Sequence, residues 1–399
     1  MSEPTPPDYN ACTRADLIVI CKEKGIRGYS TKKKDELIAL IMASTAATAT
    51  ATATAPASPS QKEKDKPYLK EFLEAHRTKT GGYKRIVSSP LRYAGGKTKA
   101  ICLILEHLPA LREKKIVSPF FGGGSFEVAL AMHLGFQVIG YDIFGMLTNF
   151  WTQLTTQPTQ LADALATMKP TEEEFTRNRH ILLNYWEKIK PADLEYRTKN
   201  RLELTDEEKT RLDANPLLQA AYYYYNMQLS YGPMFLGWPS SVYLKDGRYT
   251  GVLERIRAFR APNLSVRCES FEKVIAAHPD DFLFLDPPYY LGGDSKMFKG
   301  MYPNCNFAIH HNSFDHGLLA DLLKKHRGGF LITYNDCPTI RKMYEGYEQV
   351  FPSWQYTYGQ GEKRIGKNRV EGTGDNVKES HEIFIICPPL PPLHATPGA

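Results

Sequence analysis

The chain has 399 residues, of which 42% are hydrophobic and 24% are charged, with a formal net charge of +6 and a pI near 8.7. This is the composition of a globular protein with one large domain or two to three smaller ones. Seven cysteines without a Cys-x-x-Cys pair exclude a disulfide framework and a zinc knuckle, and they favour a reducing compartment. No apolar stretch approaches a membrane span or the core of a signal peptide, so we expect an intracellular protein without a membrane partner.

Residues 8–43 form the first predicted unit, a small helical module. Thr13 is placed to cap a helix, and apolar residues recur at helical spacing both after it and again from residue 37. This order resembles a SAP-type helix–extended loop–helix module that binds DNA. Lys32, Lys33 and Lys34 open the second helix, whose N-terminus is a natural phosphate site. We therefore expect DNA binding here, the alternative being a solvated helical hairpin whose lysines only aid solubility.

Residues 44–87 are predicted to be a flexible linker followed by a basic arm. Residues 44–60 are almost entirely Ala, Thr, Pro and Ser, without charge or large apolar side chains, and cannot build a core. The rest of the segment is rich in lysine. The Pro-rich residues 389–399 predict a disordered tail.

Alternating strands and helices predict an α/β fold from residue 88 onward. The helical patterns lie at residues 97–108 and 124–134, and they act as crossovers between parallel strands. Seven strands with such crossovers indicate a doubly wound sheet, built from residues 88–149 and 263–388. The predicted strands cover residues 115–117, 137–141, 264–268, 282–285, 330–334, 348–351 and 382–386.

The alternation is interrupted at residues 150–262, which predict an inserted, mostly helical second domain. Helical patterns at residues 169–185 and 206–224 are followed by an aromatic and Gly-rich stretch from Tyr231 to Tyr249.

A Gly-rich segment at residues 118–125 follows the first strand and opens a helix. Glycines at this place let a ligand approach the backbone and leave helix N–H groups free. Asp142 ends the next strand, where a carboxylate is placed to hold ribose hydroxyls. The combination predicts a cofactor that contains a nucleoside, although a GxGxxG fingerprint is absent.

Two further segments carry side chains suited to a ligand. In Leu-Arg-Tyr-Ala-Gly-Gly-Lys, Tyr93 is able to stack on a ring, and two glycines place Lys97 near a helix start within reach of a carboxylate. The apolar residues 282–285 read as a strand buried on both faces, followed directly by Asp286-Pro287-Pro288-Tyr289. The prolines stop the sheet and leave a carboxylate and an aromatic ring at its carboxyl edge, where open α/β sheets bind ligands.

The order of these segments resembles the Dam-type family of DNA adenine-N6 methyltransferases, over about residues 88–388. The family has a Rossmann-like seven-stranded sheet with a target-recognition insert, which Tyr225-Asn226 and residues 232–235 resemble. By this resemblance Asn226 and Tyr231 are expected to contact DNA. The chain departs from the family pattern in Ser118, where an acidic residue is usual, and in Tyr93, where Trp is frequent. The family's base-reading side chains are poorly matched, so no target sequence is carried over.

The resemblance implies S-adenosylmethionine as cofactor and double-stranded DNA as substrate. The residues that match the family's cofactor contacts are Tyr93, Lys97, Phe120, Gly122, Gly124, Asp142 and Asp286. Asp286 and the carbonyl of Pro287 would hold the adenine amine, and Tyr289 would stack on the base after it has flipped out of the duplex. This chemistry needs no metal.

Other readings remain open on the sequence alone. They are a DNA-binding protein that has lost catalysis, a nucleotide-dependent oxidoreductase, and methylation of a cytosine amine or of RNA. The sequence leaves open the recognised site, the oligomeric state and whether a separate restriction endonuclease accompanies the enzyme. A SAP-like module fused to such an enzyme, without a sorting signal, suggests a large DNA virus or a mobile element as the source. We expect the protein in the cytoplasm or the nucleus, on DNA.

Overall fold

The computed structural model divides the chain into two compact units, residues 1–65 and 66–399. It describes residue 9 and residues 12–23, 33–39, 41–42, 67–79, 81–189, 204–232, 235–292, 314–352 and 382–390. No helix in this described part is long and apolar enough to cross a membrane.

The first unit has a small core of its own. Helix α1 (Arg14–Glu23) starts after Thr13, whose Oγ1 accepts a hydrogen bond from the Asp16 N–H at 3.3 Å. Leu17, Cys21, Leu37 and Ile41 bury their side chains completely against one another. The residues are spaced as an amphipathic helix pair requires.

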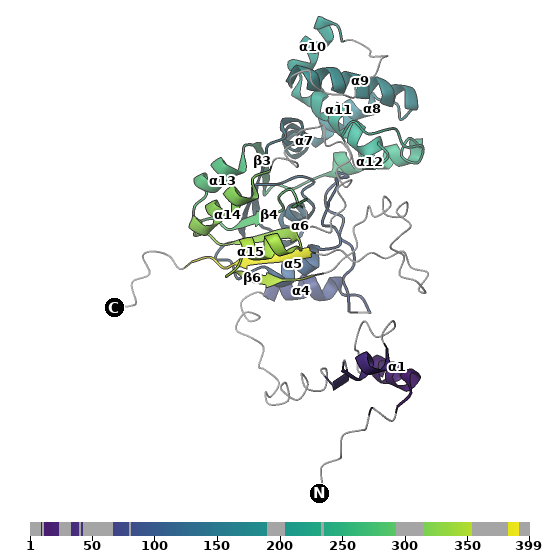
Figure 1. Cartoon of the computed structure of the whole chain (residues 1–399). Coiled ribbons are helices and arrows are strands. Elements are labelled where there is room, and N and C mark those ends of the chain that lie inside the picture. Colours follow the sequence, from purple (N-terminus) through teal and green to yellow (C-terminus); the bar gives the residue numbers. More distant parts are fainter. Residues whose placement is uncertain are drawn as a thin grey trace, which may run out of the picture. The chain divides into compact units, whose positions relative to one another are not determined.

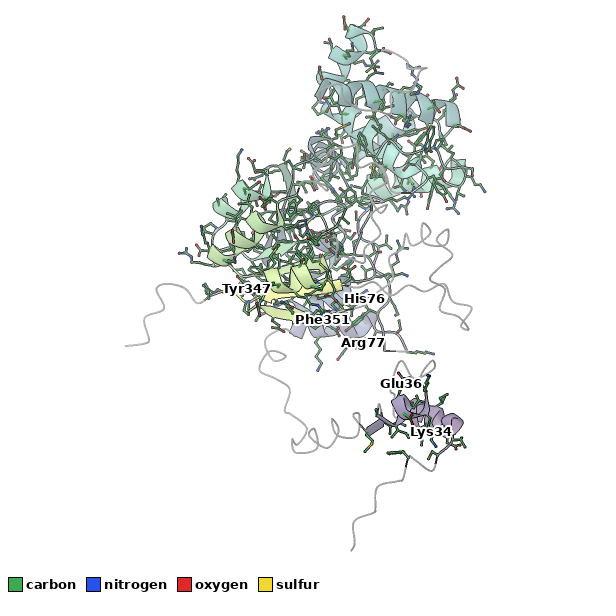
Figure 2. All side chains as sticks on the ribbon, viewed as in Figure 1. Lys34, Glu36, His76, Arg77, Tyr347 and Phe351 are labelled. Carbon is green, nitrogen blue, oxygen red and sulfur yellow. The ribbon has the colours of Figure 1, made fainter. Side chains whose placement is uncertain are left out.

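The predicted phosphate-binding lysines lie at the start of the second helical segment of this unit. Lys33 and Lys34 are exposed, and the Lys33 N–H donates to the Glu36 carboxylate at 2.8 Å, which caps that segment. Figure 2 labels Lys34 and Glu36 in this segment. Lys32 lies outside the described residues.

The second unit is built on a seven-stranded sheet in the order β3-β2-β1-β4-β5-β7-β6 (Figure 1). The first five strands in this order are parallel, and β7 is antiparallel to both of its neighbours. The expected seven-stranded α/β sheet is confirmed, and each strand lies within one residue of its predicted bounds. The strands are β1 (Lys115–Ser118), β2 (Gln137–Asp142), β3 (Leu264–Cys268), β4 (Leu283–Leu285), β5 (Phe330–Asn335), β6 (Glu348–Val350) and β7 (Glu382–Cys387).

Helices cover both faces of this sheet because alternate strand residues point into two separate hydrophobic clusters. Phe284 and Leu331 belong to one cluster, whereas Leu283, Leu285 and Ile332 belong to the other. Strands buried on both faces are continuous apolar runs, as the sequence shows here. The helices outside the insert are α4 (Pro67–His76), α5 (Ile101–His107), α6 (Ser125–Leu134), α7 (Gly145–Thr156), α13 (Phe271–Ala277), α14 (His316–Lys325) and α15 (Pro338–Met343).

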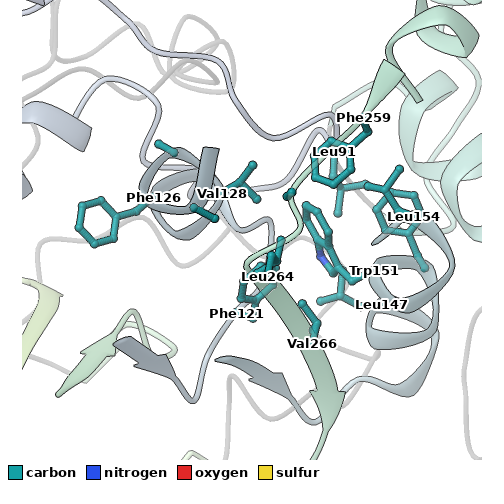
Figure 3. Packing of buried hydrophobic residues seen from close by; sticks show 14 of the residues in the cluster. Leu91, Phe121, Phe126, Val128, Leu147, Trp151, Leu154, Phe259, Leu264 and Val266 are labelled. Carbon is teal, nitrogen blue, oxygen red and sulfur yellow. The ribbon is translucent and has the colours of Figure 1, made fainter. Parts of the chain in front are cut away.

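Five helices between β2 and β3 gather into a group of their own, with α7 between this group and the sheet (Figure 1). Helix α7 packs against both α11 and β3, and so joins the two parts. Trp151 of α7 lies in the shared core with Leu147, Leu154 and Val266 (Figure 3). The five helices are α8 (Pro158–Ala166), α9 (Glu172–Ile189), α10 (Asp206–Asp213), α11 (Pro216–Leu229) and α12 (Asp246–Ala258).

Candidate active site

The carboxyl ends of β1, β2 and β4 meet at one edge of the sheet, and this edge carries the predicted site residues. The ladder between β4 and β5 ends at the pair Leu285 and Ile332. It stops there because Pro287 and Pro288 have no N–H to donate. Asp286 is left at the edge, with its side chain 25% exposed.

Asp286 and Lys97, 189 residues apart in sequence, form an ion pair at this edge. The Lys97 Nζ lies 2.7 Å from Asp286 Oδ1 and 2.6 Å from Oδ2, and it also donates to the Gly95 carbonyl at 3.0 Å. The Lys97 side chain is only 4% exposed. Thr333 Oγ1 donates to the same Oδ1 at 2.7 Å. Both oxygens of the Asp286 carboxylate are therefore engaged.

The Gly-rich loop is held by contacts that only glycine permits. A Cβ on Gly123 would come within 2.4 Å of Tyr93 Cβ, and one on Gly124 within 2.6 Å of the Phe121 ring. Gly122 and Gly124 have φ of +48° and +58°, in the left-handed region that favours glycine. The structure thus brings Tyr93 against this loop.

Asp142 organises the same loop from the end of β2. Its carboxylate accepts hydrogen bonds from the Gly122 N–H at 2.9 Å and from the Phe144 N–H at 3.0 Å. The Trp151 Nε1 donates to the Gly122 carbonyl at 3.0 Å from the other side. Asp142 is half-buried. The Phe120 ring, in the same Gly-rich segment, lies 5.5 Å from that of Phe271.

The turn after β4 is fixed by side chains that the sequence patterns did not single out. The Tyr289 hydroxyl donates to Glu382 Oε2 at 2.7 Å. Asn335 accepts from the Tyr290 N–H at 2.8 Å and donates to the Tyr290 carbonyl at 2.9 Å. With Thr333 on Asp286, three polar side chains of β5 and β7 hold consecutive parts of the turn. The sequence signal for these contacts was the presence of Thr333, Asn335 and Glu382 as polar residues in otherwise apolar strands.

Tyr289 is buried in this arrangement, with 4% of its surface exposed. The Lys97 Nζ lies over its ring, 5.1 Å from the centroid. One face of the Tyr289 ring is therefore occupied by the same ammonium that pairs with Asp286.

A second buried acid, Glu127, lies close to this pair and was also missed. It accepts a hydrogen bond from Ser118 Oγ at 2.7 Å. Burial raises the pKa of its carboxyl to about 7; Ser118 and Lys97 lower it, and Asp286 raises it. Ser118 occupies the position where the family usually has an acidic residue. This departure was the sequence signal that an acid from another position, here Glu127, could take the place of the missing one.

Asn226 is not a surface residue, which corrects the expectation that it contacts DNA. Its side chain is completely buried in α11, and its Oδ1 accepts from the Leu236 N–H at 2.7 Å. Leu236 has φ of +59°, a strained conformation for a branched side chain, and Arg179 Nε donates to its carbonyl at 2.9 Å. Asn226 and Arg179 thus hold a strained turn in place.

Tyr231, in contrast, is 59% exposed, and Trp238 beside it is 67% exposed. The Tyr231 N–H donates to the Trp238 carbonyl at 2.6 Å, so both rings belong to one short loop. The Arg92 Nη1 donates to the Gln228 and Ser230 carbonyls at 2.6 and 3.0 Å. Because Arg92 precedes Tyr93, this contact ties the insert loop to the active-site edge.

A Gly-rich loop and two strand-end carboxylates at the carboxyl edge of a mostly parallel sheet mark the usual ligand-binding place of an α/β enzyme. The family model for D12 class N6 adenine-specific DNA methyltransferases matches residues 93–358, about two thirds of the chain. The chain belongs to this family and is an adenine-specific DNA methyltransferase. The predicted resemblance to Dam-type enzymes is thereby confirmed. A search of curated proteins finds no match to the chain.

Proposed function

We propose that the enzyme transfers a methyl group from S-adenosylmethionine to the exocyclic amine of an adenine that has flipped out of double-stranded DNA, at a specific site. The observation that carries this proposal is the position of Asp286, half-buried at the carboxyl end of β4 beside a Gly-rich loop and Asp142. A paired base keeps its amine inside the duplex, so it must leave the stack to reach such a site.

The residues at the edge fit the chemistry of this cofactor. Asp142 offers carboxylate oxygens to ribose hydroxyls, Tyr93 and Phe120 offer aromatic surface, and Lys97 offers a cation to the amino-acid carboxylate. The close-packed glycines allow backbone approach. When bound, S-adenosylmethionine supplies a methyl group on a positively charged sulfur.

The chain's own part in the reaction is to hold the amine. The adenine amine is a weak nucleophile because its lone pair is delocalised into the ring. Asp286 and the Pro287 carbonyl would accept its two N–H groups, which favours a pyramidal nitrogen and stabilises the positive charge that develops there. The fixed turn keeps these acceptors aligned without reorganisation during the reaction.

Contacts with DNA are proposed for the exposed loop of the insert and for the first unit. Tyr231 and Trp238 present apolar ring area near Arg179, which lies 4.8 Å from the Trp238 ring centroid. Lys33 and Lys34 of the SAP-like module would contact phosphates, which adds affinity without reading sequence.

Methylation-aware sequencing of DNA from cells that express each variant tests the proposal. We expect methylated adenines within one short motif for the wild type, and a loss of about 100-fold or more for Asp286→Ala. Asp163→Asn, a change at an exposed surface ion pair, is the matched control and should methylate like the wild type. Absence of any modified adenine with the wild type would refute the proposal.

A further inference from the structure

The ammonium of Lys97 lies where the target amine would have to bind. It contacts both oxygens of Asp286, at 2.7 and 2.6 Å, and lies over the Tyr289 ring. Thr333 takes a further position on Oδ1. Asp286 is one of the two acceptors that the proposed function assigns to the adenine amine, and Tyr289 is the ring that the family resemblance assigns to stacking on the base. An amine nitrogen and the Lys97 nitrogen cannot occupy the same position.

Lys97 will not leave Asp286 without another anion to pair with. Its side chain is nearly completely buried, and separating a buried ion pair leaves two charges without compensation. Water alone is a poor replacement in such a site. The amino-acid carboxylate of the cofactor is an anion that arrives at this same edge, and the long stem of a lysine allows the ammonium to move between two partners.

The position of Lys97 also decides the charge that Asp286 presents to a ligand. While Lys97 pairs with Asp286, the charge of the carboxylate is compensated, and Lys97 and Thr333 make three contacts to its two oxygens. Once Lys97 pairs with a second carboxylate, Asp286 recovers acceptors for an amine and a charge that complements a nearby sulfonium. The bound cofactor and the flipped base would then favour the same arrangement of Lys97, which is a positive coupling between two ligands.

We propose that Lys97 blocks the base subsite of the free enzyme and that the cofactor's carboxylate draws it away, so that the flipped adenine is accepted only after the cofactor has bound. This inference rests on the proposed function. It gives Lys97 a second role in addition to contact with the cofactor, namely control of the order in which the cofactor and the flipped adenine bind.

Ligand binding tests the pairing of Lys97 with the cofactor's carboxylate. S-adenosylhomocysteine carries that carboxylate, whereas 5′-methylthioadenosine has the same nucleoside and thioether without the amino-acid part. We measure by calorimetry how much more tightly each protein binds S-adenosylhomocysteine than 5′-methylthioadenosine. Lys97→Met should reduce this ratio of affinities by about tenfold or more, as expected for the loss of a charge-assisted hydrogen bond. Lys324→Met, which removes an exposed lysine charge at the end of α14, is the matched control and should keep the preference.

Base flipping tests the block itself. The adenine mapped by methylation sequencing is replaced by 2-aminopurine in a duplex, whose fluorescence rises when the base leaves the stack. For the wild type we expect a severalfold rise with S-adenosylhomocysteine and little rise without ligand or with 5′-methylthioadenosine. For Lys97→Met and Lys97→Gln we expect the rise without any ligand.

The possible outcomes distinguish the block from the proposed function. Equal flipping by the wild type in all three conditions overturns the block, as does a dependence on S-adenosylhomocysteine that persists in both Lys97 variants. The wild-type comparison decides the matter even if the variants do not fold. Absence of any methylated adenine would overturn the proposed function, and the inference with it.

Discussion

Glu127 is a carboxyl group whose protonation is coupled to the fold. Burial raises its pKa from the ordinary value of 4.5 to about 7. Between these two values the folded protein holds a proton that the unfolded chain has released. The free energy of unfolding therefore falls as the pH rises from about 4.5 to about 7, and the loss is complete above that range.

Glu127→Gln removes this titration while it keeps an oxygen that accepts from Ser118. We expect the variant to be more stable than the wild type at pH 8 by on the order of 1–3 kcal/mol. The difference should shrink at pH 5, where the wild-type carboxyl is protonated. Urea unfolding at both pH values measures the two differences, and equal differences would contradict the assignment.

At the scale of elements, β5 and β7 hold the turn after β4 through their side chains. The two prolines end the backbone ladder, and the Asn335 side chain takes over its function by bonding both the N–H and the carbonyl of Tyr290. Asn335 pairs with Glu382 in the β5–β7 register, and Glu382 accepts from Tyr289. After β4 the main-chain ladder to β5 has ended, and hydrogen bonds from side chains of β5 and β7 hold the turn in its place.

Asn335→Ala should misplace this turn and lower kcat by about tenfold or more, because small displacements of aligned groups lose much of the benefit of orientation. The affinity for S-adenosylhomocysteine should change less, since Asn335 bonds Tyr290 in the turn after β4 and not the Gly-rich loop. Steady-state kinetics and calorimetry give the two values. Asn149→Ala is the control, because it removes a hydrogen bond from the side-chain amide of α7 to the Pro216 carbonyl. An unchanged kcat would show that the turn keeps its position without Asn335.

Sequence patterns located most of the strands because the apolar run ends at or next to Pro, Asp or Asn, as in β1, β2, β4, β5 and β7. They also placed Lys97 near a carboxylate, but the choice of Asp286 depends on strand order, which joins β1 to β4 across a long insertion. Asn226 was misplaced for a physical reason. Residues 223–229 of α11 are all buried, so the helix has no polar face by which an inward residue could be distinguished from an outward one. The roles of Asn335 and Glu382 were missed because their partners, Tyr290 and Tyr289, lie in the turn after β4, far away in the sequence.

At the scale of the whole molecule, the chain combines two compact units, residues 1–65 and 66–399. The second unit carries the family match and holds Asp286, Lys97 and Asp142 at one edge of its sheet. The small unit has a core of four fully buried side chains and exposes Lys33 and Lys34. A tethered basic module raises the local concentration of DNA at the catalytic unit without reading bases.

Removal of residues 1–65 should therefore weaken DNA binding and reduce its salt dependence, while the methylated motif stays the same. The slope of log K against log salt becomes shallower by about 0.9 for each phosphate that the protein no longer neutralises. In the full-length chain, Lys33→Gln with Lys34→Gln should reproduce part of this change, because the module keeps its core. Lys324→Gln with Lys325→Gln, at the exposed end of α14, is the matched control for net charge. Binding titrations across a salt series and methylation sequencing of each variant measure both quantities. A changed motif in the truncated enzyme would mean that the module reads bases, and an unchanged slope would mean that it does not contact phosphates.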